Sequence, residues 1–223
     1  KVTIYCDYDV DGTASAAILL DALPRFGLTV DYYVPDRFKE GYGLNKEAIK
    51  HLHDTGTDLV LTVDNGIVSF DEVDYASQLG LDMIITDHHS PRDTLPRAVA
   101  VVDPKVTWRD QPEIYDKHFC LRDRRRRLYP FLDLCGAGVA FKLVEALGQT
   151  FPADLPTGQE KWLLDLVAIA TVSDIVTLAD ENRALVYWGL KVLQKTRRPG
   201  IKALVAVAGL DLMEVDSQAI GYM

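Results

Sequence analysis

Short apolar segments rich in β-branched residues alternate with longer amphipathic stretches over the first 104 residues. This alternation is typical of a parallel sheet whose strands are joined by helices that pack on its faces. We expect strands at Val2–Cys6, Thr29–Val34, Leu59–Val63, Met83–Thr86 and Val99–Val102. Between them we expect helices at Thr13–Phe26, Asn45–Asp54 and Ser69–Leu79. The sequence therefore predicts an α/β fold with a parallel sheet of about five strands flanked by helices.

The second half of the chain follows a different pattern. Between residues 105 and 135 the apolar periodicity fails and charged residues are dense, which favours a connecting loop or an insertion. From Gly136 onward the periodicity is helical, with expected helices at Val139–Leu147, Lys161–Leu178, Arg183–Gln194 and Ile201–Ala208. We expect an α/β metal-binding sheet over residues 1–104, a charged connection over 105–135, and a mainly helical segment over 136–223 that completes the same domain.

The charge balance counts against a simple electrostatic grip on nucleic acid. Acidic residues outnumber basic ones by 33 to 24, which gives a formal net charge of −9. The objection weakens if many of the acids converge on divalent cations, because a bound cation inverts the local charge that a phosphate meets. The most basic segment is Arg124–Arg127, which is either a solvated charged face or a contact to a phosphate backbone.

Membrane and secreted proteins are disfavoured as classes. No apolar run approaches the roughly 18 residues that a membrane-spanning helix needs, and the N-terminus lacks the layout of a signal peptide. Cys6, Cys120 and Cys135 are odd in number and lack the spacing of a zinc site, so we expect reduced thiols. The expected protein is cytoplasmic and does not contact a membrane.

Acidic residues follow the ends of several expected strands. Asp7, Asp9 and Asp11 follow the first strand, Asp64 follows the third, and Asp103 follows the fifth. In sheets of this kind, ligands bind at the carboxyl ends of the strands, where these side chains should meet. Because hard divalent cations bind several oxygen ligands, the pattern indicates a metal site at this edge.

Two other motifs share part of the first acidic cluster. An EF-hand loop begins with similar spacing, but it needs a Glu where this chain has Ile18, and it needs a helix where this chain has a strand. The run Asp9-Val10-Asp11-Gly12-Thr13 also resembles the first motif of haloacid-dehalogenase-like phosphatases. Against that interpretation, Asp7 places a charge on a strand end that those enzymes keep apolar. Helix capping alone explains one carboxylate but hardly three.

Further candidates lie at the same edge of the sheet. His88 and His89 directly follow Asp87 at the end of the fourth strand, a pattern that packing rarely requires and that favours His88 as a metal ligand. Asp64, taken alone, is more simply explained as a turn-forming residue. Arg37, just beyond the second strand, is either a phosphate contact or a solvated loop arginine. The glycines of 136–141 lack the full dinucleotide-binding pattern and indicate close helix packing.

Four motifs, in order, give the chain a resemblance to a known family. The segments CDYDVDGTAS, VDNGI, TDHHSP and ATVSDIVTL resemble the four motifs of the DHH phosphoesterases. Within that superfamily, PDRFKEGYGLN, YPFLDLCGAGVAFKL and DENRALVYWGL resemble segments typical of RecJ-type exonucleases. The resemblance spans nearly the whole chain, and it favours this family over the dehalogenase-like phosphatases.

The resemblance implies a site that binds two divalent ions, Mn²⁺ or Mg²⁺. Its implied ligands are Asp9, Asp11, Asp64, His88 and Asp174, with Asp64 bridging the ions. His89 would then donate to the substrate phosphate. Many family members have a His where this chain has Tyr5, so one metal site would be weaker or would be completed by Asp7 and water.

The RecJ-type resemblance also implies a function. It is hydrolysis of single-stranded DNA from the 5′ end, in recombination and repair, with single-strand-binding protein and a helicase as partners of the full-length protein. Two alternatives stay open: a DHH phosphodiesterase that acts on short oligonucleotides or cyclic dinucleotides, and a non-catalytic replication scaffold. Because the chain begins at Lys1 and stops at Met223, we expect it to be part of a longer protein. The DHHA1-type and nucleic-acid-binding domains would lie downstream.

Overall fold

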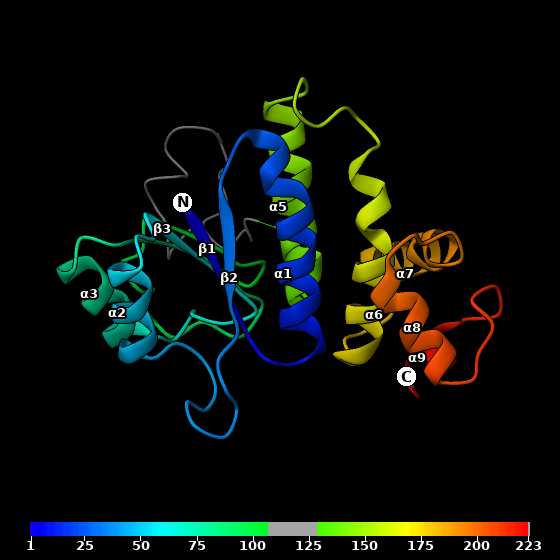
Figure 1. The fold of residues 1–223 in the computed structure, drawn as a ribbon, viewed down its shortest axis with the longest axis horizontal. Helices are drawn as coiled ribbons and strands as arrows, with labels where there is room; N and C mark the ends of the chain where they lie inside the picture. Colours follow the sequence, from blue (N-terminus) through cyan, green and yellow to red (C-terminus); the bar gives the residue numbers. More distant parts are fainter. Residues whose placement is uncertain (107–128, 223) are drawn as a thin grey trace.

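The computed structural model describes residues 1–106 and 129–222 (Figure 1). Five parallel strands form one sheet in the order β2-β1-β3-β4-β5. The strands are β1 (Val2–Cys6), β2 (Val30–Tyr33), β3 (Leu59–Val63), β4 (Asp82–Thr86) and β5 (Ala100–Val102). The predicted α/β class with a five-stranded parallel sheet is confirmed. The Arg124–Arg127 run and Cys120 lie outside the described residues.

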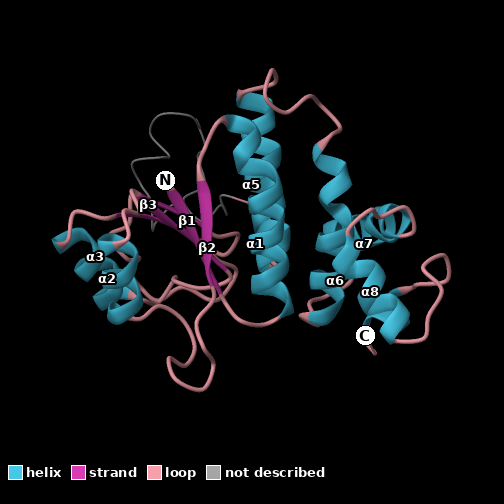
Figure 2. Cartoon of the chain, in the orientation of Figure 1, coloured by secondary structure: helices cyan, strands magenta, loops and turns pink. Residues whose placement is uncertain are grey.

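Helices cover both faces of the sheet, because alternate strand residues point to opposite sides (Figure 2). One face packs against α2 (Lys46–Asp54) and α3 (Phe70–Gln78), and its core includes Tyr5 and Ile85. The other face packs against α1 (Val10–Ala22) and α5 (Gly136–Thr150), and its core includes Ile4. This arrangement buries the sheet on both sides.

A further layer of helices packs on α1 and α5, away from the sheet (Figure 1). Its elements are α6 (Leu164–Ser173), α7 (Asp180–Leu193), α8 (Pro199–Val207) and α9 (Ser217–Ile220). Two short 3-10 helices, η1 (Leu23–Phe26) and η2 (Glu160–Leu163), follow α1 and precede α6. Among the described residues, no helix is long and apolar enough to cross a membrane.

Several helix ends differ from the sequence prediction. The expected helix Lys161–Leu178 ends as an α-helix at Ser173, because Asp174 caps it and Ile175 has a left-handed backbone with φ 58°. Asp174 therefore lies at a helix end and not within a helix. The first helix starts at Val10, ahead of the expected Thr13, because the Asp9 side chain caps it. The short helix α9 was not expected from the periodicity.

The strand order reverses direction between β1 and β3. The chain leaves β1 toward β2 on one side and later returns to form β3 on the other side of β1. In an open parallel sheet, this reversal leaves the loops after the two central strands pointing apart, and ligands bind in the gap. The loops that follow β1 and β3 begin at Asp7 and Asp64.

The contact between α6 and α7 gives a test of packing. A Cβ atom added at Gly189 would lie 2.3 Å from the Leu164 carbonyl oxygen and 2.5 Å from the Ala168 Cβ. We expect Gly189→Ala to lower the free energy of unfolding by about 1–3 kcal/mol, because the two helices must move apart. The matched control is Gly200→Ala in α8, where an added Cβ meets nothing within 4 Å. Urea unfolding of both variants measures the difference, and equal stability would contradict this packing.

Candidate metal centre

The loop after β1 presents three carboxylates in different environments. The Asp7 side chain is buried, and its Oδ1 has no hydrogen-bond partner among the described residues. Asp9 is exposed and caps α1 by accepting from the Gly12 amide at 2.9 Å. Asp11 is 1% exposed, in the first turn of α1. Gly12 allows this tight loop, because a Cβ there would lie 2.5 Å from the Asp7 carbonyl oxygen.

The N-terminus of α5 fixes the position of Asp11. Its carboxylate accepts hydrogen bonds from the amides of Gly136, at 2.5 Å, and Ala137, at 2.8 Å. These amides are free to donate because the first turn of a helix leaves its N–H groups unpaired. A Cβ at Gly136 would lie 2.8 Å from the Asp64 Cβ and 3.0 Å from Asp11 Oδ2. The glycine therefore lets α5 approach both acids.

Asp64 and His88 meet at the ends of β3 and β4. Asp64 is buried and has a left-handed backbone with φ 61°, an uncommon conformation for a residue other than glycine. His88 Nε2 lies 3.0 Å from Asp64 Oδ1, 3.7 Å from Asp11 Oδ2 and 3.8 Å from Asp174 Oδ2. One imidazole thus lies beside acids from three separate segments of the chain.

The side chains fall into three sets whose potential ligand atoms all lie within 4.8 Å of one another. The sets are Asp7, Asp9 and Asp64; Asp11, His88 and Asp174; and Asp64, His88 and His89. Every ligand implied by the family resemblance occurs in at least one set. Asp64 and His88 each occur in two of them, and of the two only the carboxylate has two oxygens that could contact separate ions. The structure therefore brings the expected ligands together, and their binding of metal stays a prediction.

The electrostatics of this cluster favour a cation. Burial raises the pKa of the Asp64 carboxyl, and the charges of Asp11 and Asp9 raise it further. Burial also raises the pKa of Asp11, to about 6, although the amides of α5 oppose the shift. The pKa of Asp174 is shifted in the same direction, mainly by burial. The unpartnered Oδ1 of Asp7 lies in the same cluster. Crowded carboxylates held away from water are stabilised when divalent ions neutralise them, so this donor set fits such ions.

Asp87 has a role that the sequence analysis did not assign. Its buried carboxylate accepts from the amides of Ile67 and His88 and from His89 Nδ1, the last at 2.7 Å. This hydrogen bond raises the pKa of His89 to about 9, and it lowers the pKa of Asp87 although burial opposes that change. The Asp87 carboxylate thus favours the protonated form of the His89 ring, whose Nε2 lies 3.5 Å from the Tyr42 hydroxyl. The only sequence signal was the position of Asp87 directly before the histidines.

Arg37 and Tyr5 contact groups outside the three candidate ligand sets. Arg37 is exposed, and its guanidinium lies 5.3 Å from the ring centroid of Tyr8, within the loop that carries Asp7 and Asp9. Tyr5 is fully buried, and its hydroxyl donates to the Gly43 carbonyl oxygen at 3.1 Å. The same hydroxyl accepts from the Asn45 side-chain amide at 3.2 Å, so its partners among the described residues are Gly43 and Asn45 and not the acids.

Comparisons with known proteins decide the family. A family model described as "DHH family, N-terminal domain" matches residues 1–171. The chain belongs to the DHH family. The single-stranded-DNA-specific exonuclease RecJ of Bacillus subtilis is 42% identical to this DHH-family chain over 222 residues, which are 100% of the chain and 25% of that protein. The protein of the same name from Escherichia coli is 38% identical over 232 residues, 100% of the chain and 37% of that protein.

Solved structures agree with this assignment. A crystal structure of exonuclease RecJ bound to manganese has a TM-score of 0.77 and 31% identity to this DHH-family chain. The match covers 99% of this chain and 50% of the RecJ chain in that crystal structure. The crystal structure of RecJ from Thermus thermophilus in complex with Mn²⁺ has a TM-score of 0.75 and 29% identity. That match covers 99% of this chain and 28% of the Thermus thermophilus chain. The chain spans about a quarter to somewhat over a third of the two curated relatives named above.

The close approach of α5 gives a test of the DHH-family centre. We expect Gly136→Ala to weaken Mn²⁺ binding by roughly 10–100-fold, because the added methyl group would displace Asp64 and Asp11. This is the range seen when residues that orient metal ligands are replaced. The matched control is Gly138→Ala in the same helix, where a Cβ meets only the flexible side chain of Leu134, at 3.3 Å. Titration calorimetry with Mn²⁺ measures both, and equal affinities would contradict the argument.

The pKa shifts predict how stability depends on pH without divalent ions. Burial raises the pKa of Asp103 to about 7, and that of Asp11 to about 6, so the folded state holds these protons above the unfolded pKa of about 3.9. His89, whose pKa is raised to about 9, contributes stability below its unfolded pKa of about 6.5 and loses it as pH rises through 9. All three make the apo DHH-family protein less stable between pH ~4 and ~9. Calorimetry in EDTA should show that Tm falls as the pH is raised from about 4 to about 9. A Tm that rises over this range would contradict these shifts.

Proposed function

We propose that this chain carries out metal-dependent hydrolysis of phosphodiester bonds in single-stranded DNA, as part of a 5′-to-3′ exonuclease of recombination and repair. The supporting observation is the gathering of acids and a histidine beyond the carboxyl ends of the strands, where the strand order reverses between β1 and β3. They are Asp7, Asp9, Asp11, Asp64, His88 and Asp174. Similarity over the whole chain to single-stranded-DNA-specific exonucleases supports the substrate class.

The ligands in this proposal are Asp9, Asp11, Asp64, His88 and Asp174, with Asp7 as an additional candidate. Asp64 is the carboxylate shared by two of the sets, so it would contact both ions. Mn²⁺ or Mg²⁺ suits a donor set made of oxygens and one imidazole nitrogen. These residues would hold ions that, when bound, would supply Lewis acidity and lower the pKa of a water molecule.

His89 is assigned to the substrate phosphate. Asp87 occupies its Nδ1 at 2.7 Å, which fixes the ring and leaves Nε2, at 3.5 Å from the Tyr42 hydroxyl, as the nitrogen that would donate to a substrate. The ring is half-exposed, unlike the buried His88, so a substrate can reach it. A donor held in this way stabilises negative charge as it develops on the phosphate oxygens. Arg37, exposed beside Tyr8, is proposed as a second phosphate contact.

Digestion of single strands tests the proposed function. Long and short oligonucleotides carry a label at the 5′ or the 3′ end and are incubated with the protein and Mn²⁺. Rapid release of a 5′-labelled mononucleotide, while 3′-labelled strands shorten gradually, is the expected result. Cleavage of short strands or cyclic dinucleotides alone would favour the small-substrate phosphodiesterase. Absence of any cleavage with Mn²⁺ bound would favour a non-catalytic scaffold. The proposal includes a cytoplasmic location, and it includes single-strand-binding protein and a helicase as partners of the full-length protein.

A further inference from the structure

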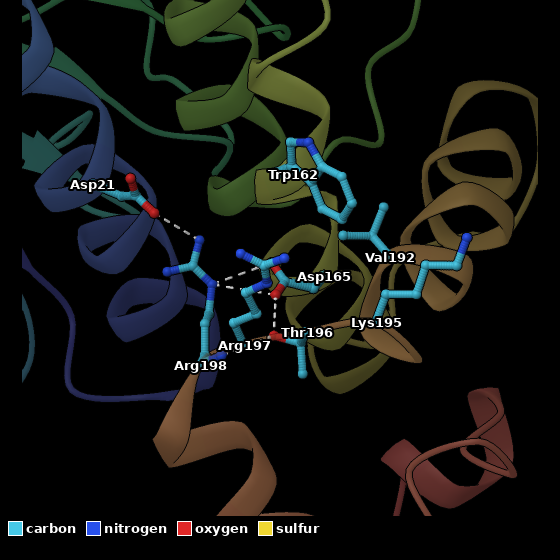
Figure 3. Close-up of a pocket in the computed structure, with 8 residues that line it drawn as sticks. All are labelled: Asp21, Trp162, Asp165, Val192, Lys195, Thr196, Arg197 and Arg198. Atoms are coloured by element: carbon cyan, nitrogen blue, oxygen red, sulfur yellow. Dashed lines mark hydrogen bonds and ion pairs between the residues drawn. The ribbon is translucent and has the colours of Figure 1, made fainter.

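Two adjoining cavities lie on the side of the molecule formed by η2 and α7. The larger, of about 690 Å³, includes Trp162, Lys195 and Arg197 in its lining (Figure 3). The smaller, of about 460 Å³, is also lined by Trp162 and Lys195, and it adds Lys161, Trp188 and Lys191. Because the two cavities share Trp162 and Lys195, they form one continuous surface. We call this surface the tryptophan groove and define it by these six residues.

The groove exposes large aromatic rings. Trp162 and Trp188 are each 59% exposed, one from η2 and the other from α7. Most of the large apolar side chains around them are packed into the core, including Leu164 and Leu185 in the floor of the smaller cavity. Two solvent-exposed indole rings at one concave surface are unusual for an isolated domain. They therefore indicate a site where a flat or apolar group binds.

The groove is also basic, in a chain whose formal net charge is −9. Lys161, Lys191, Lys195 and Arg197 are all exposed, and none forms an ion pair with a described acidic residue. Lys191 lies over the Tyr187 ring, 5.9 Å from its centroid. Four unpaired cations beside two exposed indoles therefore attract an anion that carries aromatic faces.

Other cations around the groove are already neutralised. Arg198, in the wall of the larger cavity, pairs with Asp21 at 2.9 Å and with the buried Asp165 at 3.2 Å (Figure 3). Lys142 pairs with Glu145 and Glu181, each at 2.7 Å. These paired cations hold helices together, whereas the unpaired cations of the groove face solvent. The difference separates structural charges from charges available to a ligand.

Chemistry selects a nucleic-acid strand over a protein partner. The cores of protein interfaces are enriched in Trp but depleted in Lys, so lysines set between indoles fit poorly there. Surfaces that bind single strands combine cations along the backbone with aromatic rings on which bases stack. We propose that the tryptophan groove binds single-stranded nucleic acid through base stacking on Trp162 and Trp188 and phosphate contacts to its lysines.

This contact would lie away from the metal centre. The groove begins at the N-terminal end of α6, and Asp174 caps the C-terminal end of that ten-residue helix, so about 15 Å of helix separates them. The identity of the strand rests on the proposed function, in which the groove would hold part of a long strand while its end is cleaved. The acidic net charge then coexists with nucleic-acid binding because the cations are concentrated on one surface.

Binding of labelled oligothymidylate, followed by fluorescence anisotropy in EDTA to prevent cleavage, tests the groove. Trp162→Ala and Trp188→Ala should each raise the Kd at least fivefold, the lower end of the effect of losing one stacked base. Lys161→Ala combined with Lys195→Ala should lower the slope of log K against log salt by about 1.4, since each phosphate contact on a single strand contributes about 0.7.

Lys202→Ala, an exposed lysine of α8 outside the groove, is the matched control and should bind as the unchanged protein does. Circular dichroism confirms that each variant is folded. Affinity and salt slope equal to those of the control in all groove variants would overturn the proposal and leave the groove to a different occupant. Cleavage of labelled strands by the unchanged protein is measured separately. If the unchanged protein binds the strand in the groove but does not cleave it, the result would count against the proposed function and not against the groove.

Discussion

Asp64→Asn is expected to abolish hydrolysis while the fold stays intact. Asn keeps an oxygen that can accept from His88 and tolerates the left-handed backbone at φ 61°, which Ala would strain. The substitution removes the charge that the account assigns to both ions. The rate should therefore fall by more than the roughly 10²–10³-fold that loss of one transition-state donor costs.

Single-turnover cleavage of a labelled single strand at saturating Mn²⁺ measures this effect. The matched control is Asp74→Asn, an exposed acid on α3 that lies outside the cluster and should leave the rate unchanged. Unfolding curves establish that both variants are folded. An Asp64→Asn protein that kept a tenth of the original rate would refute the bridging assignment.

His89→Ala is expected to damage chemistry and to spare metal binding. Its Nδ1 is occupied by Asp87 at 2.7 Å, whereas His88 lies among the acids, so the two histidines have different partners. The Mn²⁺ affinity should stay nearly unchanged, while kcat falls by roughly 10²–10³, the range for loss of one donor to a developing oxyanion.

Titration calorimetry with Mn²⁺, beside single-turnover cleavage, separates the two roles. His53→Ala, an exposed histidine on α2, is the control and should alter neither quantity. The alternative is that His89 is itself a metal ligand, because it also occurs in a candidate ligand set with Asp64 and His88. A parallel collapse of affinity and rate would make His89 a ligand and remove the division of labour between the histidines.

The sheet could be predicted because its determinants are local. Runs such as Val2–Cys6 and Leu59–Val63 are apolar on both faces, and each is found as a strand with those bounds. Helix ends were harder to predict, since they depend on single residues. The end of α6 rests on the left-handed backbone of Ile175, a β-branched residue that gives no sequence signal for that conformation.

Some residues of the site could also be predicted from local sequence, whereas others could not. The acids that follow β1 and β3 are visible in the sequence, because the carboxyl ends of parallel strands share one edge. Asp174 could be named only from the family resemblance, since nothing local brings a residue after α6 toward His88. The contact of Asp11 with the Gly136 amide joins positions 125 residues apart, and no pattern in either segment predicts it. Asp87 was visible as an acid, but its hydrogen bond to His89 depends on the folded loop.

Anomalous diffraction at the manganese edge, from crystals soaked in Mn²⁺, tests the central claim most directly. The account predicts two anomalous peaks roughly 3.5–4 Å apart. One should lie beside Asp7 and Asp9 and the other beside Asp11, His88 and Asp174, with Asp64 in contact with both. A single peak, or two peaks of which only one contacts Asp64, would contradict a two-ion centre built around this carboxylate.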